Sequence, residues 1–275
     1  MQKDYKIGFM QGRLLKSENN NKIQFFPSSS WKEEFFLASK NNFGLMEWTI
    51  NNENIKKNPL YNGNILEIKR LQKKYSLKIQ SVTCDFFMQK PFFKKTFLTQ
   101  KKILINQLVH IIKNAESIGI KYFILPLVDQ SSIKTITEEK ILIKSVLKIL
   151  PVLRKNSIIL FESDYNPERV MSFIKKFKSK KVGINYDTGN SAFLGYDFKQ
   201  EIKYFSYVKN IHIKDKNLNG KSVRLGTGNW NYKKFFFLIR KINFKYNFIL
   251  QTGRSIKNEH IKELNINRNF LFNNL

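Results

Sequence analysis

The chain has 275 residues with a net charge of +28, and its 42% hydrophobic and 14% aromatic residues can build a substantial core. This composition excludes an intrinsically disordered basic tail protein. The single cysteine excludes an internal disulfide framework and a cysteine-rich zinc module.

Strand-like apolar runs alternate eight times with segments of helical periodicity along the chain. The predicted strands cover residues 5–10, 44–49, 77–84, 121–126, 157–162, 181–187, 208–213 and 246–251. The predicted helices that follow them cover residues 31–42, 64–75, 100–119, 138–155, 167–180, 197–205, 231–242 and 258–272.

This order predicts an α/β protein. The runs lack polar alternation, which is typical of parallel strands covered by helices on both faces. Eight repeats favour a single (β/α)8 TIM barrel over residues 1–275 rather than an open doubly wound sheet. A dinucleotide-binding fold has no support, because no G-x-G-x-x-G follows the first strand. The long irregular stretch at residues 14–30 is a candidate active-site lid.

Polar residues follow the apolar runs where the predicted strands end, which is where TIM barrels place their catalytic groups. Glu162, Asp187 and His212 come from three consecutive strands, so they can converge at the barrel mouth. Two carboxylates and one imidazole are a typical divalent-metal ligand set. Taken singly, such an Asp could cap a helix, and the His could be a hydrogen-bonded core residue.

With these residues in place, the chain resembles the sugar phosphate isomerase/epimerase family, the xylose-isomerase-like TIM barrels of the AP endonuclease family 2 superfamily. The resemblance extends over essentially the whole chain in the expected order. It is carried by IGFMQGRL, GLMEW, SVTCDFFM, LFESDYNP, NYDTGN, NIHIKDK, LGTGNWNYKKFF and FILQTGR.

The resemblance implies that Glu162, Asp187 and His212 are three of four ligands of a divalent ion, Mn²⁺, Mg²⁺, Co²⁺ or Zn²⁺. The fourth ligand is normally Glu, and here it is Gln251. An amide oxygen can coordinate, but an amide cannot take a proton near neutral pH. With two carboxylates instead of three, the ion should bind more weakly and be a stronger Lewis acid.

Proton transfer must then rest on Glu162 or on another group at the mouth. Glu47, Asp85 and Lys214 are the nearest candidates by strand position, and we predict catalytic roles for Glu162, Lys214 and Glu47. Lys214 could equally form a salt bridge with Asp215.

Basic residues at the mouth suit a phosphorylated or acidic sugar. We predict that the substrate is bound by Arg13, Asp85, Arg224 and Arg254. The loops after strands seven and eight are the usual phosphate site of such barrels, and an arginine fork fits phosphate. Arg254 could instead pair with a carboxylate and hold its loop.

The leading functional hypothesis is metal-dependent isomerisation or epimerisation of a sugar or sugar phosphate through an enediolate. Because position 251 is Gln and carries no carboxylate, isomerase or dehydratase chemistry is favoured over two-base epimerisation. The alternatives are a keto-polyol dehydratase and a non-catalytic sugar-binding barrel. The endonuclease branch of the superfamily needs a histidine-rich zinc cluster, yet His110 and His260 lie on predicted helices.

The net charge of +28 bears on whether the protein binds nucleic acid. Because the lysines are spread over nearly every segment, we expect solvated helix faces and no specific nucleic-acid partner; weak charge-driven binding is the alternative. Apolar runs are too short for a signal peptide or a span of ~20 residues, so we expect a cytoplasmic protein without a membrane partner. A homodimer is as compatible with the sequence as a monomer.

Overall fold

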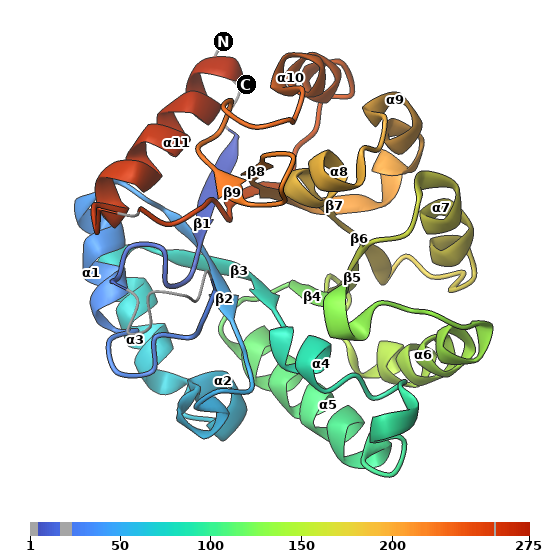
Figure 1. Cartoon of the computed structure of the whole chain (residues 1–275). Helices are drawn as coiled ribbons and strands as arrows, with labels where there is room; N and C mark the ends of the chain where they lie inside the picture. Colours follow the sequence, from blue (N-terminus) through green and yellow to red (C-terminus); the bar gives the residue numbers. More distant parts are fainter. Residues whose placement is uncertain (1–4, 17–23, 256) are drawn as a thin grey trace.

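Eight parallel strands close into a barrel in a computed structural model that describes residues 5–16, 24–255 and 257–275 (Figure 1). The order around the barrel is β1-β10-β7-β6-β5-β4-β3-β2. This confirms the predicted (β/α)8 barrel. The strands are β1 Lys6–Met10, β2 Leu45–Thr49, β3 Lys78–Thr83, β4 Tyr122–Leu127, β5 Ile158–Ser163, β6 Val182–Asp187, β7 Val208–Ile213 and β10 Asn247–Leu250.

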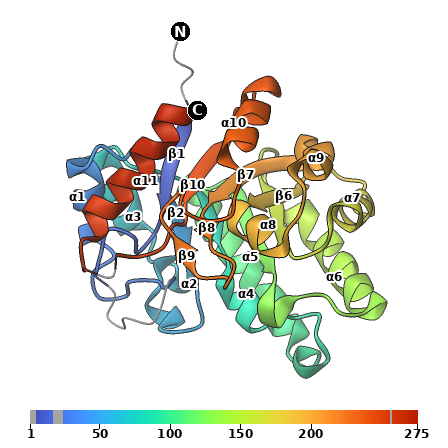
Figure 2. The same ribbon diagram turned by 45° about the horizontal axis from the view of Figure 1, so that its top comes forward.

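Helices form a ring around the barrel, as Figures 1 and 2 show. Their apolar faces pack on strands that are themselves almost fully buried, as expected for a parallel sheet covered by helices. The larger helices are α1 Glu33–Lys40, α3 Leu66–Tyr75, α5 Lys101–Ser117, α6 Ile136–Ile149, α7 Pro167–Lys175, α10 Tyr232–Lys241 and α11 His260–Asn274.

Short elements lie in the loops. The short α-helices are α2 Pro59–Asn62, α4 Asp85–Gln89, α8 Thr188–Leu194 and α9 Phe198–Glu201. The 3₁₀ turns are Ile55–Lys57, Lys95–Phe97, Asp129–Ser131, Leu150–Val152 and Ile202–Tyr207, and a hairpin pairs β8 Asp215–Lys216 with β9 Ser222–Val223.

Several predicted helices have different ends in the structure; the helix predicted at 167–180, for example, ends at Lys175. The helix predicted at 138–155 begins at Ile136, because Thr135 and Glu138 form a capping box, and ends at Ile149 before a 3₁₀ turn that contains Pro151. The helix predicted at 197–205 is split into α9 and a 3₁₀ turn.

The loops at the barrel mouth are short after β3 and β6, which fixes the side chains there. α4 begins at Asp85, directly after β3, and Asp187 caps α8 by accepting a hydrogen bond from the Asn190 N–H at 2.8 Å. Of the predicted lid at 14–30, residues 17–23 lie outside the described residues. No helix in the described ranges is both long and apolar enough to cross a bilayer.

Candidate active site

Three side chains from adjacent strands meet at the carboxyl end of the barrel. Glu162 of β5, Asp187 of β6 and His212 of β7 each offer a ligand atom, and these atoms lie within 4.8 Å of one another. His212 Nδ1 is 2.9 Å from Glu162 Oε2 and 3.9 Å from Asp187 Oδ2. The cluster is buried, so its charges interact with little screening by water.

Glu47 holds the other side of the His212 ring. Its Oε1 lies 2.7 Å from His212 Nε2 and accepts a hydrogen bond from Thr83 Oγ1 at 2.6 Å, while its Oε2 accepts from Asn210 Nδ2 at 3.0 Å. Because β2 continues to Thr49, Glu47 lies inside the strand rather than at its end, and it is fully buried. Both of its oxygens are therefore occupied in orienting neighbours.

Two asparagines support the cluster and were missed by the sequence analysis. Asn185 Nδ2 donates to Glu162 Oε2 at 2.9 Å, and Asn210 Nδ2 donates to Asn185 Oδ1 at 2.7 Å. Each lies two residues before a candidate ligand, Asp187 or His212. Alternate residues of a strand share a face, so this spacing was a usable signal.

Burial and the neighbouring charges shift the pKa values of the clustered side chains. Burial lowers the pKa of His212, but the carboxylates of Glu47 and Glu162 outweigh it and raise that pKa to about 10. Burial raises the pKa of Glu162, yet His212 and the charge of Lys214 lower it to about 2. Burial raises the pKa of Asp187 against the opposing charge of Lys214. Glu162 is therefore ionised at neutral pH.

Lys214 reaches the cluster. Its Nζ lies 2.7 Å from Asp187 Oδ2, so the alternative of a salt bridge with Asp215 is wrong. The Asp215 carboxylate instead accepts backbone N–H groups of the following loop, including Gly228 at 2.9 Å. Gly189 makes room for Lys214, because a Cβ there would lie 2.1 Å from Lys214 Cγ.

A relay of amides crosses the mouth from β3 to β10. Gln24 Nε2 donates to Asp85 Oδ2 at 2.5 Å, and Gln251 Nε2 donates to Gln24 Oε1 at 2.5 Å. In its ionised form Asp85 only accepts, and in that form it orients both amides. Within the described part of the chain, no group donates to the buried Oε1 of Gln251. Gln24 thus turns Gln251 so that its oxygen is available to a cation.

Asp85 itself differs from the other carboxylates. Burial and the charge of Glu162 raise the pKa of Asp85 to about 7, against the hydrogen bond from Gln24. It can therefore exchange a proton near neutral pH.

The predicted arginines lie in different places. Arg13 is buried and its Nε donates to Thr252 O at 3.0 Å. Arg254 donates to Gly12 O at 2.6 Å and to Leu15 O, so it holds the loop after β1 through carbonyls rather than a carboxylate. Arg224 forms a two-point ion pair with Glu263 of α11, at 2.7 and 2.8 Å, and the structure does not bring it to the carboxylate cluster.

Glu34 also holds the loop after β1. Its carboxylate accepts the N–H groups of Gly12 at 2.8 Å and Leu14 at 3.1 Å, and it is fully buried. Burial raises the pKa of Glu34 from 4.5 to about 7, against the N–H groups and the charges of Arg254 and Arg13.

The raised pKa of Glu34 predicts a pH-dependent stability. The folded protein binds this proton more tightly than the unfolded chain, so the free energy of unfolding should fall as pH rises from about 4.5 to about 7. The loss should be on the order of 1–3 kcal/mol, as measured by urea unfolding between pH 5 and pH 8. Glu34→Gln should flatten this slope, whereas Glu33→Gln, at the exposed neighbouring position, should keep it. Equal slopes in the two variants would contradict the assignment.

The residues at the mouth fit a divalent cation. Two carboxylates, an imidazole and an amide oxygen form a mixed O/N donor set that Mn²⁺, Mg²⁺, Co²⁺ and Zn²⁺ accept. Gln251 follows β10, the strand next to β7, and its unpartnered oxygen makes it a candidate fourth donor to add to Glu162, Asp187 and His212.

Comparison with solved structures finds similar barrels over nearly the whole chain. The D-allulose 3-epimerase of Methylomonas sp. in complex with D-allulose has a TM-score of 0.78 and 10% identity, over 98% of this chain and 97% of that chain. A xylose isomerase-like TIM barrel protein of Mycobacterium smegmatis in complex with magnesium has a TM-score of 0.72 and 16% identity, over 98% and 96%. The IOLI protein with a bound zinc atom has a TM-score of 0.75 and 13% identity, over 98% and 97%.

At these identities the likeness shows the fold. A search of curated protein sequences finds no match. The family model described as xylose isomerase-like TIM barrel matches residues 35–268, which is most of the chain. The chain therefore belongs to the xylose isomerase-like TIM barrel family.

Proposed function

We propose that the protein is a divalent-metal-dependent isomerase or epimerase that acts on a sugar or sugar phosphate through an enediolate. The observation that carries the proposal is the meeting of Glu162, Asp187 and His212 within 4.8 Å at the barrel mouth. Sugar epimerases among the structural neighbours, including one that holds D-allulose, support this substrate class.

The proposal assigns the metal to Glu162, Asp187, His212 and Gln251. When bound, a divalent ion supplies a Lewis acid that polarises a sugar carbonyl and acidifies the adjacent C–H. His212 Nδ1 faces the carboxylates and is the ring nitrogen that would serve as the ligand. To serve as a ligand, the ring would release its Nδ1 proton to solvent. Its Nε2–H would then donate a hydrogen bond to Glu47, which orients the ring, so we reassign Glu47 from catalysis to positioning.

Proton transfer is assigned to Glu162 and Asp85. Glu162 is ionised at neutral pH, which is the state that a base needs to remove the α-proton. Asp85 exchanges a proton near neutral pH and lies across the Gln24 relay from Gln251, so it supplies the acid/base that an amide cannot. Lys214 and Arg13 carry positive charge beside these groups and would stabilise an anionic substrate.

Turnover of a substrate panel tests this assignment. Free and phosphorylated ketoses are incubated with the protein and Mn²⁺ in D₂O, and the products are identified by mass spectrometry and chromatography. An isomer or epimer that carries solvent deuterium supports the proposal, and an eliminated product would identify the dehydratase alternative. Sugar binding without turnover with any of the four metals would identify a non-catalytic barrel.

Gln251→Glu tests the fourth ligand. The added charge should strengthen Mn²⁺ binding roughly tenfold, or ~1.4 kcal/mol. Calorimetry measures the affinity. Gln200→Glu adds the same charge at an exposed position of α9 and should leave the affinity unchanged. Similar gains in both variants would show that only overall charge matters.

The basic charge predicts weak binding of DNA. Lysines from α5 and α6 line a groove on the outer surface, where Lys101, Lys102, Lys140, Lys144 and Lys148 lie together. We expect binding that is independent of sequence at low salt and absent near ~0.15 M salt, since screening removes exposed charge interactions. Fluorescence anisotropy with two unrelated duplexes measures this, and nanomolar binding at physiological salt would favour a nucleic-acid function.

A further inference from the structure

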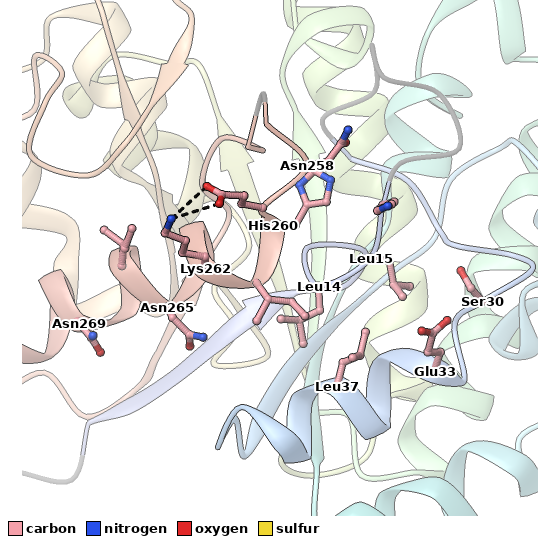
Figure 3. Close-up of a pocket in the computed structure, with 14 residues that line it drawn as sticks. Leu14, Leu15, Ser30, Glu33, Leu37, Asn258, His260, Lys262, Asn265 and Asn269 are labelled. Carbon is pink, nitrogen blue, oxygen red and sulfur yellow. Dashed lines mark hydrogen bonds and ion pairs between the residues drawn. The ribbon is translucent and has the colours of Figure 1, made fainter.

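A second pocket lies between α1 and α11, beside the barrel (Figure 3). Its volume is about 960 Å³, which is large enough for a small organic molecule. Figure 3 shows Asn258, His260 and Asn265 on the α11 side, facing Leu14, Leu15 and Leu37. The lining residues come from the segment after β1, from α1 and from α11 with the residues before it, so this pocket is separate from the candidate active site.

His260 is the side chain in this pocket whose hydrogen-bonding capacity is unused. It is only 8% exposed, and neither ring nitrogen has a hydrogen-bond partner among residues 5–16, 24–255 and 257–275. The Oδ1 atom of Asn265 is likewise buried and unpartnered in these ranges, while its Nδ2 donates to Asn41 at 3.2 Å. Leaving buried polar atoms unpaired is unfavourable, and an occupant that forms hydrogen bonds with them would remove this cost.

The pocket as a whole is lined by charges of both signs, Lys16 and Lys262 with Glu33 and Glu259, but the charges that act on the His260 ring are cationic. Burial and the charges of Arg254, Lys16 and Arg13 lower the pKa of His260. The ring is therefore neutral near pH 7 and offers one donor and one acceptor. His260 also begins α11, a helix of 15 residues whose N-terminus favours negative charge. Cationic neighbours and the helix end together favour an anionic group beside the ring.

The opposite wall is apolar. Leu14 and Leu15 are buried in the loop after β1, and Leu37 of α1 and Ile261 and Ile266 of α11 complete this surface. We propose that the pocket binds an organic anion, with its phosphate or carboxylate group at His260 and its apolar body along these leucine and isoleucine side chains. This site is additional to the proposed sugar site and does not depend on it.

Nuclear magnetic resonance of labelled histidines tests the proposal, because the chain has only three histidines. Hexyl phosphate, hexanoate and inorganic phosphate are titrated separately at pH 7.5. The His260 ring signals should shift saturably with at least one of the two hexyl probes. The stronger probe identifies a phosphate ester or a carboxylate as the preferred group. If hexyl phosphate is that probe, it should bind at least tenfold more tightly than inorganic phosphate.

Variants separate this site from general anion binding. His260→Ala should weaken the preferred probe at least tenfold, whereas His110→Ala should not, since His110 bonds Tyr61 O and Asn114 on α5. Absence of a saturable His260 shift with all three probes would overturn the proposal, and so would unchanged binding by the folded His260→Ala variant. The wild-type shifts decide the matter if that variant does not fold.

Discussion

Glu162→Gln is expected to lower turnover of the sugar substrate by roughly 10²–10⁴-fold, the usual contribution of a positioned general base. The amide keeps an oxygen for the cation and can still accept from Asn185 or Asn190, which contact this side chain at 2.9 and 3.1 Å. It cannot take the α-proton. The variant should therefore be inactive while it still binds metal.

Steady-state kinetics and calorimetry on the same sample measure the two properties. Glu168→Gln makes the same change at an exposed position in the first turn of α7 and should leave both unchanged. Substantial turnover by Glu162→Gln with metal bound would exclude Glu162 as the base and leave Asp85 as the remaining candidate.

Asp187→Asn is expected to weaken metal binding by more than roughly 100-fold, beyond the 10–100-fold that supporting residues typically cost. The substitution removes one of two carboxylates from a buried site. It also leaves the ammonium of Lys214 without its ion-pair partner, and that charge then opposes a cation. Asparagine can still cap α8, so the backbone should be preserved.

The control for this variant is Asp197→Asn. Asp197 is also a helix cap: it precedes α9, accepts the Lys199 N–H at 3.0 Å and pairs with Lys234, but it is exposed. Calorimetry with Mn²⁺ at neutral pH should show near-normal binding for Asp197→Asn and almost none for Asp187→Asn. Equal binding by the two variants would place the ion elsewhere.

The site residues that the sequence predicts are those whose positions follow from the order of the parallel strands. Glu162, Asp187 and His212 follow apolar runs in consecutive strands, and closing the barrel brings the ends of such strands together. The supporting asparagines were equally accessible, because they lie two residues before two of these ligands. Strand order and side-chain alternation were sufficient for this region.

The rest depends on contacts between loops, which no local pattern encodes. Gln24 lies 61 residues from Asp85 and 227 from Gln251, and only the path of the loop after β1 brings them together. The partner of Arg224 lies 39 residues away on α11. Lys214 can form its ion pair with Asp187 because Gly189 has no side chain to occupy the space that Lys214 crosses. Each of these requires tertiary packing that a single sequence does not display.

These loop contacts change the chemical interpretation of Gln251. From sequence alone it is a lost carboxylate, which weakens the case for acid/base chemistry on the strand-eight side. In the structure, Gln24 orients its amide so that the oxygen is free, and Asp85 stands at the other end of the relay with a pKa of about 7. In the proposed assignment, the ligand and acid/base roles that one glutamate fills in related epimerases by the family resemblance are divided between Gln251 and Asp85.

A crystal structure of the protein soaked with Mn²⁺ would show whether a divalent ion binds at the barrel mouth. Anomalous scattering locates the ion without reference to any assumed ligand. We expect one peak at the barrel mouth, contacted by Glu162, Asp187 and His212 and by the oxygen of Gln251, with Glu47 retained on the far side of the His212 ring. A mouth that stays empty at millimolar Mn²⁺, with the Lys214–Asp187 ion pair intact, would contradict the metal assignment and the isomerase mechanism built on it.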